Sequence, residues 1–490
     1  MSKQKRLTRV LTAALVSVMT VPVVVAGVAG AATGPIPTVG LYAASSEETL
    51  FKYGRRVPLF FGMWLEAIGG DFELRVARDD YDSPLEITQT DSATGETLRT
   101  LPEDVLDGWN GLDDFVQITF RDAAGTEVAS TVVTLCPNGY SRQRVGDAGP
   151  AVPRYPYSCG AGSPFTRGMI WGIDNHWAVN ATAGEYEGAS VRVDAGEYKV
   201  TVEVAPRYVD LFDIAPERAL ATVDVTVKNV RRRHHKGPFP VEGRRRVTQD
   251  SPQQGVPTML TPDPANLPDL VAHPPWSITV GHRARSGKDL LAFAATEWNE
   301  GPRQLVVEGF RRRGENVMDA YQYFYDDSGE AVGRAPVGSL EYHEGRGHNH
   351  WHFLQFTTYK LLSLDGNEIV RSKKQSFCIV PTTVVDLTIP GADWMTVPQS
   401  LQTSCGGRES IWVREVLQTG WGDTYYQVGG QSFDITDLPN GWYLMAVEVN
   451  PLGALHETDT TNNVETRMLN LRGQPGKRKV IVTPWHGIDA

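Results

Sequence analysis

Apolar and polar residues alternate in short segments along most of this chain. The alternation is clearest in "FELRVA" (72–77), "VQITF" (116–120) and "YKVTVEV" (198–204), and Gly, Asp and Pro residues separate such segments. A period of two residues is typical of antiparallel β-strands that bury one face. No long segment follows the 3.6-residue period of an amphipathic helix. The pattern therefore predicts an all-β protein.

β-Rich sequence occupies two regions, residues 40–229 and residues 267–473, which flank a segment of different composition. Residues 230–266 are basic and then Pro-rich, which favours an exposed linker. The tail, residues 474–490, is short and basic, and we expect it to be loose. A chain of 490 residues is also too long for one ordinary core. We therefore predict two tandem antiparallel β-sandwich-like domains joined by this linker.

The two β-rich regions share an order of landmarks. "GEYKVTVEVAP" (196–206) matches "GWYLMAVEVNP" (441–451) at its Gly, Tyr, Val, Glu and Pro positions. Each region has two cysteines, 23 residues apart in the first (159 − 136) and 27 in the second (405 − 378), followed by a Trp-Gly pair at Trp171 or Trp421. This order favours a tandem repeat. Two unrelated β-sandwiches with similar turn chemistry are the alternative.

The start of the chain has the features of a targeting segment. Four basic residues precede an apolar run that ends in Gly and Ala. This arrangement is typical of a secretory signal peptide, residues 1–31, which is cleaved near Ala31. A membrane anchor is the alternative, which Pro22 within the run disfavours. No later segment is apolar enough to span a bilayer, so we expect a secreted protein with no integral membrane segment in its mature form.

The number of cysteines and the net charge narrow the class of protein further. The four cysteines of a secreted chain predict two disulfides. Three pairings are possible, and the local one, Cys136–Cys159 with Cys378–Cys405, is the simplest. The formal net charge of −11 favours solubility and argues against a nucleic-acid partner.

Three of the 11 histidines stand at alternate positions in "GHNHWHF" (347–353). In a strand, His348, His350 and His352 would share one face, while Trp351 and Phe353 would point into a core. Three imidazoles on one face can converge on Cu, Zn, Ni or Fe and leave one position open. A solvated histidine patch is the alternative. The first region has "WNGLDDF" (109–115) at the matching place, so only the second region carries this metal site.

The second region resembles the catalytic domain of the lysyl oxidases, which are secreted copper amine oxidases. The likeness covers residues 267–473 and rests on these landmarks in order: "LPDLVAHP" (267–274), "HNHWHF" (348–353), "KQSFC" (374–378), "GDTYY" (422–426), "DITDLPNGWYLMAVEVNP" (434–451) and "ETDTTNN" (457–463).

The resemblance implies a chemistry for particular residues. His348, His350 and His352 occupy the positions of the copper (Cu²⁺) ligands, and Lys374 and Tyr425 occupy those of the side chains that form the cofactor lysine tyrosylquinone. In the family, this cofactor oxidises protein lysines and other primary amines with O₂ to aldehydes, and H₂O₂ and ammonia are released. The resemblance therefore implies a protein-lysine or primary-amine oxidase.

Amine oxidation also needs a base that removes a proton from the α-carbon of the amine. Asp423 lies two residues before Tyr425 and is a candidate by proximity, and His343 is a weaker one. A turn-forming role for Asp423 is the alternative.

Oxygen donors of the kind that calcium binds occur in the "ETDTTNN" segment. The resemblance implies that this segment and the Asp-Leu of "LPDLVAHP" form a structural Ca²⁺ site. An ordinary polar turn is the alternative. The candidate ligands are Asp269, Leu270 through its carbonyl, Glu457, Asp459, Asn462 and Asn463.

Two other functions compete with that of an enzyme. One is a non-enzymatic extracellular metal-binding protein, and the other is a structural module of paired β-sandwiches. The sequence also departs from the family's pattern. Lys374 and Tyr425 are 51 residues apart (425 − 374), and residues 384–410 contain an apparent insertion. The first β region lacks the site and could dock a substrate. The physiological amine and the oligomeric state stay open.

Overall fold

The computed structural model describes most of the chain, in these stretches: 35–182, 188–230, 255–344, 349–394, 401–426 and 430–489. The predicted signal peptide and most of the predicted linker lie outside them. Strands dominate the described secondary structure, which confirms the all-β prediction. No helix in these stretches is long and apolar enough to cross a membrane. The described helices are α1 (Pro206–Phe212), α2 (Pro216–Ala219) and 3₁₀ turns at Glu103–Val105, Gly108–Asn110 and Pro264–Asn266.

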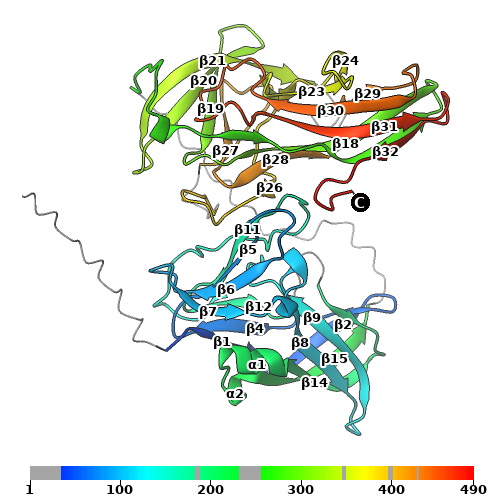
Figure 1. The fold of residues 1–490 in the computed structure, drawn as a ribbon. Helices are drawn as coiled ribbons and strands as arrows, with labels where there is room; N and C mark the ends of the chain where they lie inside the picture. The colour runs from blue at the N-terminus through cyan, green and yellow to red at the C-terminus, as the bar shows by residue number, and fades with distance from the viewer. Residues whose placement is uncertain are drawn as a thin grey trace, which may run out of the picture. The chain divides into compact units, whose positions relative to one another are not determined.

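The first part of the chain, residues 35–230, is called the N-terminal half, and its strands pair only with one another in the named sheets (Figure 1). One sheet has the order β1 (Thr38–Ala43), β4 (Met63–Ile68), β12 (Trp177–Asn180) and β10 (Arg142–Arg144), and another has the order β11 (Gly168–Ile173), β5 (Phe72–Ala77), β6 (Glu86–Thr90) and β7 (Thr97–Leu101). A short sheet pairs β13 (Ser190–Val191) with β3 (Val57–Pro58). The last sheet has the order β2 (Glu47–Lys52), β15 (Leu220–Asn229), β14 (Gly196–Val204), β8 (Leu112–Arg121) and β9 (Glu127–Leu135).

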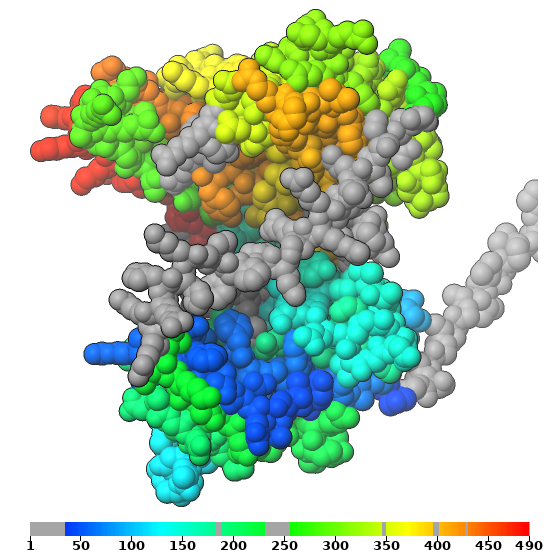
Figure 2. All heavy atoms as spheres, turned by 180° about the vertical axis from the view of Figure 1, so that it is seen from behind, coloured from blue at the N-terminus to red at the C-terminus, as the bar shows by residue number. Residues whose placement is uncertain are grey.

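The second part, residues 255–489, is called the C-terminal half and has its own sheets. Figure 2 shows both halves from behind, with this half in green to red. The first sheet has the order β16 (Leu270–Ala272), β18 (Lys288–Asn299), β28 (Trp421–Tyr426) and β26 (Thr383–Val384), and β17 (Trp276–Arg283) and β29 (Ser432–Asp434) also pair with β18. The second has the order β25 (Ser376–Phe377), β22 (His350–Leu354), β21 (Ala331–His343), β20 (Val317–Tyr325), β19 (Leu305–Arg311) and β27 (Trp412–Leu417). The third has the order β24 (Glu368–Arg371), β23 (Thr357–Leu362), β30 (Gly441–Val449), β31 (Val464–Arg472) and β32 (Lys479–Val482).

Alternation in the sequence becomes alternation of burial in the strands. In β14, Val200, Val202 and Val204 are buried in the N-terminal core, while the residues between them are more exposed. The C-terminal half has a separate core to which strands of all three of its sheets contribute, from β18 and β22 to β30 and β31. Burial of one face of each strand against such a core is the main stabilising term in folds of this kind.

One sheet in each half has the same strand order. The order β9-β8-β14-β15 in the N-terminal half corresponds to β24-β23-β30-β31 in the C-terminal half, and every pairing within the two sets is antiparallel. The next strand differs, because β2 joins β15 in parallel whereas β32 joins β31 antiparallel. The shared order supports the proposed repeat. The domain boundaries stay a prediction, and residues 36–490 form one compact unit.

The two halves contact each other through a segment of the predicted insertion. The Leu387 amide donates a hydrogen bond to the Gly168 carbonyl at 2.9 Å, and the Arg167 amide donates one to the Val385 carbonyl at 2.6 Å. The side chains of Val384 and Leu387 belong to the core of the N-terminal half. Removal of that half would therefore expose apolar surface of the C-terminal half as well as removing any docking surface.

Both disulfides have the local pairing, Cys136–Cys159 and Cys378–Cys405, as expected. The second bridge joins the end of the "KQSFC" segment to a loop that holds Trp351 of β22. The Trp351 amide donates to the Cys405 carbonyl at 2.9 Å, and the Trp351 indole nitrogen donates to the Gly407 carbonyl at 2.9 Å. The bridge thus connects the segment of Lys374 to the strand of the histidines.

Removal of either disulfide is expected to destabilise the protein by about 2–4 kcal/mol, because loops of 23 and 27 residues lose their closure. The measurement is urea unfolding of the Cys136→Ser/Cys159→Ser and Cys378→Ser/Cys405→Ser variants. The second variant should also change the near-ultraviolet signal of the buried Trp351, measured in a Trp171→Phe background because the Trp171 indole donates to the Cys159 carbonyl of the first bridge. An unchanged Trp351 signal in that variant would contradict the assignment of the second bridge to the histidine strand.

Candidate functional site

Strand β22 carries two of the three predicted copper ligands. His350 lies opposite His343 of β21, and His352 lies opposite Glu341. The rings of His350 and His352 are 4.8 Å apart between centroids, so both lie on one side of the strand. Trp351, between them, is fully buried in the core. His348 lies outside the described residues, and its role stays a prediction.

The buried His352 ring has neighbours that fix its orientation. It stacks on His343 with centroids 5.1 Å apart, and its Nδ1 lies 3.2 Å from the Ser376 hydroxyl. A hydrogen bond to one ring nitrogen of a histidine sets which nitrogen is available to a metal. Imidazole nitrogens suit copper and zinc, so the described part of this donor set fits either ion. His343, a weak candidate for the base in the sequence, lies beside the proposed ligands instead.

Another group of potential ligands does not fit a metal. Cys378, Cys405 and Glu415 have ligand atoms within 4.8 Å of one another. The two sulfurs are joined in a disulfide, and a metal binds thiolate rather than disulfide sulfur. Among the described residues, the histidines of β22 are therefore the better metal donors.

Lys374 and Tyr425 meet in the core of the C-terminal half. The Lys374 Nζ lies 4.7 Å from the centroid of the Tyr425 ring and 4.4 Å from that of Phe377. It donates a hydrogen bond to the Ser376 carbonyl at 3.1 Å. The Tyr425 hydroxyl donates one to the Cys378 carbonyl at 2.8 Å, which fixes the ring between the two segments.

Burial changes the ionisation of both side chains. Lys374 is only 8% exposed, and loss of water lowers its pKa to about 8, although the carboxyls of Asp423 and Glu297 oppose this shift. Burial also raises the pKa of the Tyr425 phenol well above its ordinary value, with a further contribution from Asp423. At neutral pH the phenol is therefore protonated, while the lysine is closer to losing its proton than an exposed lysine.

Two further acids lie near this pair that the sequence analysis did not single out. Glu297 of β18 is directly opposite Asp423 of β28, and Glu415 of β27 accepts a hydrogen bond from the Ile379 amide at 3.0 Å. All three acids are fully buried, and burial raises the pKa of each carboxyl well above its ordinary value. In the sequence, Glu297 is recognisable as the only glutamate in the apolar run "LLAFAATEW" (290–298), where a core-facing strand position is expected to be apolar.

Five of the predicted calcium ligands lie together. The Asn462 amide donates to Asp269 at 3.0 Å, the Asn463 amide donates to Glu457 at 2.8 Å, and the Leu270 amide donates to the other Glu457 oxygen at 3.0 Å. The side-chain oxygens of both asparagines are buried without a partner in the described structure. Two amide oxygens that lack partners, together with the carboxylates of Asp269 and Glu457, fit a calcium ion.

Asp459, the sixth predicted ligand, is engaged differently. It is exposed, and it accepts hydrogen bonds from the amide and hydroxyl of Thr461 at 2.8 and 2.7 Å. The local side-chain cap that was the alternative in the sequence analysis is therefore present at this residue.

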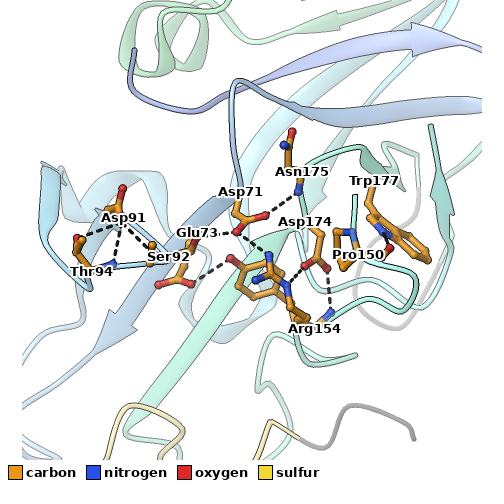
Figure 3. Close-up of polar contacts among 12 residues, drawn as sticks. Asp71, Glu73, Asp91, Ser92, Thr94, Pro150, Arg154, Asp174, Asn175 and Trp177 are labelled. Atoms are coloured by element: carbon orange, nitrogen blue, oxygen red, sulfur yellow. Dashed lines mark hydrogen bonds and ion pairs between the residues drawn. The ribbon is translucent and has the colours of Figure 1, made fainter. Parts of the chain in front are cut away.

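The N-terminal half has a polar network of another kind (Figure 3). Arg154 donates to Asp174 and to Asp71, each at 2.6 Å. Glu73 accepts hydrogen bonds from the hydroxyls of Tyr155 at 3.0 Å and Thr90 at 2.7 Å. These carboxylates have partners, so this network is that of a structural cluster.

Comparison with known proteins agrees with the geometry of the C-terminal half. Residues 326–480 match the family model described as lysyl oxidase. Over 119 residues, the chain is 32% identical to lysyl oxidase homolog 2 of Bos taurus and 34% identical to that of Gallus gallus, which covers 24% of this chain and 13% of each relative. Lysyl oxidase homolog 4 of Mus musculus is 32% identical over 123 residues, 24% of this chain and 14% of that protein.

The chain thus matches only a small part of the length of these relatives, and the residues that match the family model include β22, Lys374 and Tyr425. The identified likeness is therefore that of residues 326–480, which match the lysyl oxidase family model, in a chain that is similar over part of its length to lysyl oxidase homologs.

Proposed function

We propose that the C-terminal half is a copper-dependent amine oxidase whose lysine tyrosylquinone cofactor forms from Lys374 and Tyr425. The contact between the two side chains carries this proposal, because a lysine must reach the ring to which it becomes bonded. They are 51 residues apart in the sequence (425 − 374), yet Nζ lies 4.7 Å from the ring centroid. The match of residues 326–480 to the lysyl oxidase family model supports an amine oxidase in general terms.

Copper would be held by His350 and His352 together with His348. When bound, it supplies the one-electron chemistry with O₂ that oxidises the phenol of Tyr425 and so makes the ring reactive toward an amine. The Ser376 hydroxyl, 3.2 Å from Nδ1 of His352, would keep the imidazole of His352 in place.

The chain's own residues prepare the cross-link. With a pKa of about 8, the Lys374 amine is neutral in about half of the molecules at pH 8, and only a neutral amine is a nucleophile. The hydrogen bond of Nζ to the Ser376 carbonyl orients the amine, and that of Tyr425 to the Cys378 carbonyl fixes the ring. Phe377 contacts both side chains and excludes water from them.

Asp423 is the proposed base for the α-proton of the substrate. It lies on the same face of β28 as Tyr425, two residues away, and is fully buried. Burial raises the pKa of its carboxyl well above the ordinary value, which makes its carboxylate a stronger base than an exposed aspartate. The substrate would be a primary amine, either of a protein lysine or of a small molecule, and O₂ would be the oxidant.

We further propose a secreted protein with a structural calcium ion held by Asp269, the Leu270 carbonyl, Glu457, Asn462 and Asn463. The ion would join the start of the C-terminal half to the loop before β31. Asp459 is also included as a ligand. To reach the ion, its exposed carboxylate would have to give up its hydrogen bonds with Thr461. The N-terminal half is proposed to dock protein substrates.

Formation of the cofactor is expected to depend on Lys374 and not on its neighbour. Peptide mass spectrometry after copper loading in air should detect a cross-link of the Lys374 and Tyr425 peptides, together with its phenylhydrazine adduct. Lys374→Arg and Tyr425→Phe should abolish both. Lys373→Arg and Tyr426→Phe are matched controls, because Lys373 is exposed and Tyr426 is half-exposed. Bound copper with both wild-type peptides unmodified would favour the non-enzymatic metal-binding protein.

The rate of cross-linking should rise with pH. The lowered pKa of Lys374, about 8, means that the neutral amine increases about tenfold from pH 6 to pH 7 and approaches saturation above pH 9. The measurement is the appearance of the quinone absorbance after copper addition between pH 6 and 9.5. A rate that still increases tenfold per pH unit above pH 9 would indicate an unshifted lysine.

Calcium is expected to raise the melting temperature of the protein, because it binds only the folded state. Glu457→Gln should remove most of this increase, since Glu457 contacts both the Leu270 amide and the Asn463 side chain. Glu465→Gln, a nearby variant outside the candidate ligand set, should keep it. Melting curves with calcium and with a chelator make the test, and an unchanged calcium effect in Glu457→Gln would exclude the site.

A further inference from the structure

Two carboxyls face each other across the sheet beside the proposed cofactor residues. Strands β18 and β28 are antiparallel, and their register places Glu297 directly opposite Asp423, with Ala295 opposite Tyr425. Side chains in such a pair have Cβ atoms about 4.5–5.5 Å apart. Both acids are fully buried on the same side of the sheet, and the charge of Asp423 adds to the rise in the pKa of Glu297.

The pair differs from the other buried acids of this half. None of its four oxygens has a hydrogen-bond partner of good geometry among the described residues. The neighbouring donors are the Tyr425 hydroxyl and the Val380 amide beside Asp423 and the Tyr359 hydroxyl beside Glu297, and the Tyr425 hydroxyl is directed to the Cys378 carbonyl. Glu308, in contrast, accepts two hydrogen bonds from Arg414, at 2.8 and 2.7 Å. Buried carboxyls without good partners are costly, so their presence calls for a function.

The N-terminal half shows that the fold does not need these acids. Strands β11 and β5 pair like β28 and β18, and the Trp-Gly landmarks at Trp171 and Trp421 align the two pairs. At the register positions of Glu297 and Asp423, the N-terminal half has Phe72 opposite Ile173, both in its core. The half without the histidines thus has an apolar pair where the other half has two acids.

The charged and polar groups around the pair determine how many protons its two carboxyls bind at neutral pH. Lys374 is the nearby cation, and Glu415 is a third acid that affects Asp423. The phenols of Tyr425 and Tyr359 lie near Asp423 and Glu297 and help to stabilise their charged forms. Two adjacent carboxylates in a dry site cannot both be ionised, while one carboxylate is balanced by the ammonium of Lys374. The favoured state at neutral pH has one proton on the pair.

We propose that Glu297 is a positioning residue that shares one proton with Asp423 and thereby sets the basicity of Asp423. This inference rests on the proposed amine oxidation. The overall reaction would convert a primary amine, O₂ and water into an aldehyde, ammonia and H₂O₂. The α C–H bond of the amine would break, its proton passing to the carboxylate of the pair and its two electrons passing, through the cofactor, to O₂. Glu297 acts through Asp423 and does not contact the substrate.

The first test is infrared spectroscopy of the secreted protein at pH 7, before copper is added, so that it does not depend on activity. A protonated carboxyl has a carbonyl band that a carboxylate lacks. Glu297→Gln and Asp423→Asn should each remove the same band, because the remaining acid then ionises beside Lys374. Glu415→Gln, which removes an equally buried acid, should remove a different component. A band that survives in Glu297→Gln overturns proton sharing.

The second test is the pH profile of kcat/KM for a small primary amine, with the quinone content of each variant measured by phenylhydrazine. Glu297→Gln should form the quinone, lower the plateau several-fold and move the acid limb about one pH unit or more to lower pH, because Asp423 loses its negative neighbour. Glu415→Gln should move it less. An unmoved limb in Glu297→Gln overturns the proposal. Absence of quinone from the wild type refutes the proposed function instead, and the infrared result then still decides proton sharing.

Discussion

Pairing of β28 with β18 determines which side chains enter the core of the C-terminal half next to Phe377. Because the period of a strand is two, a slip of one residue would turn both Asp423 and Tyr425 away from Lys374 and replace them with Thr424 and Tyr426. The register is held by an apolar face that includes Phe293 and Ala295, and by the contact of Thr296 with Thr424 at 2.9 Å on the opposite face. The positions of the chemical groups therefore depend on ordinary packing of their neighbours.

Charge balance then connects these groups to one another. Lys374 is a cation in a buried site, and the carboxyls of Asp423 and Glu297 are what make its charge tolerable there. A bond between Lys374 and the Tyr425 ring would remove that cation. The carboxylate that balanced it would become harder to keep ionised and would bind a proton more strongly. Formation of the proposed cofactor would thus also activate the proposed base, with no movement of the chain.

Much of this architecture could be predicted from local sequence patterns. Alternation in segments such as "YKVTVEV" predicts a strand whose buried face is known, as Val200 and Val202 show. The pairing of nearby cysteines and the shared side of His350 and His352 also follow from local spacing. The nearness of Lys374 and Tyr425 does not, since it depends on long-range strand pairing. Only the family's pattern indicated it.

The roles of Glu297 and Glu415 could not be predicted for a related reason. A glutamate within an apolar strand is recognisable as unusual, but its partner is set by the register of a strand more than 100 residues away (423 − 297). Asp459 shows the opposite case. It belongs to a ligand pattern in sequence, yet its carboxylate is used locally by Thr461.

The difference between Phe72–Ile173 and Glu297–Asp423 has a consequence for the evolution of thermal stability. The two strand pairs have matching registers with and without a buried acid pair, so the acids are a cost in stability that the proposed chemistry would account for. Selection for heat resistance alone would replace them with apolar residues, as in the N-terminal half. A more stable protein would then arise by loss of the proposed base, and thermal robustness among variants of this protein would be a poor guide to the proposed catalytic competence.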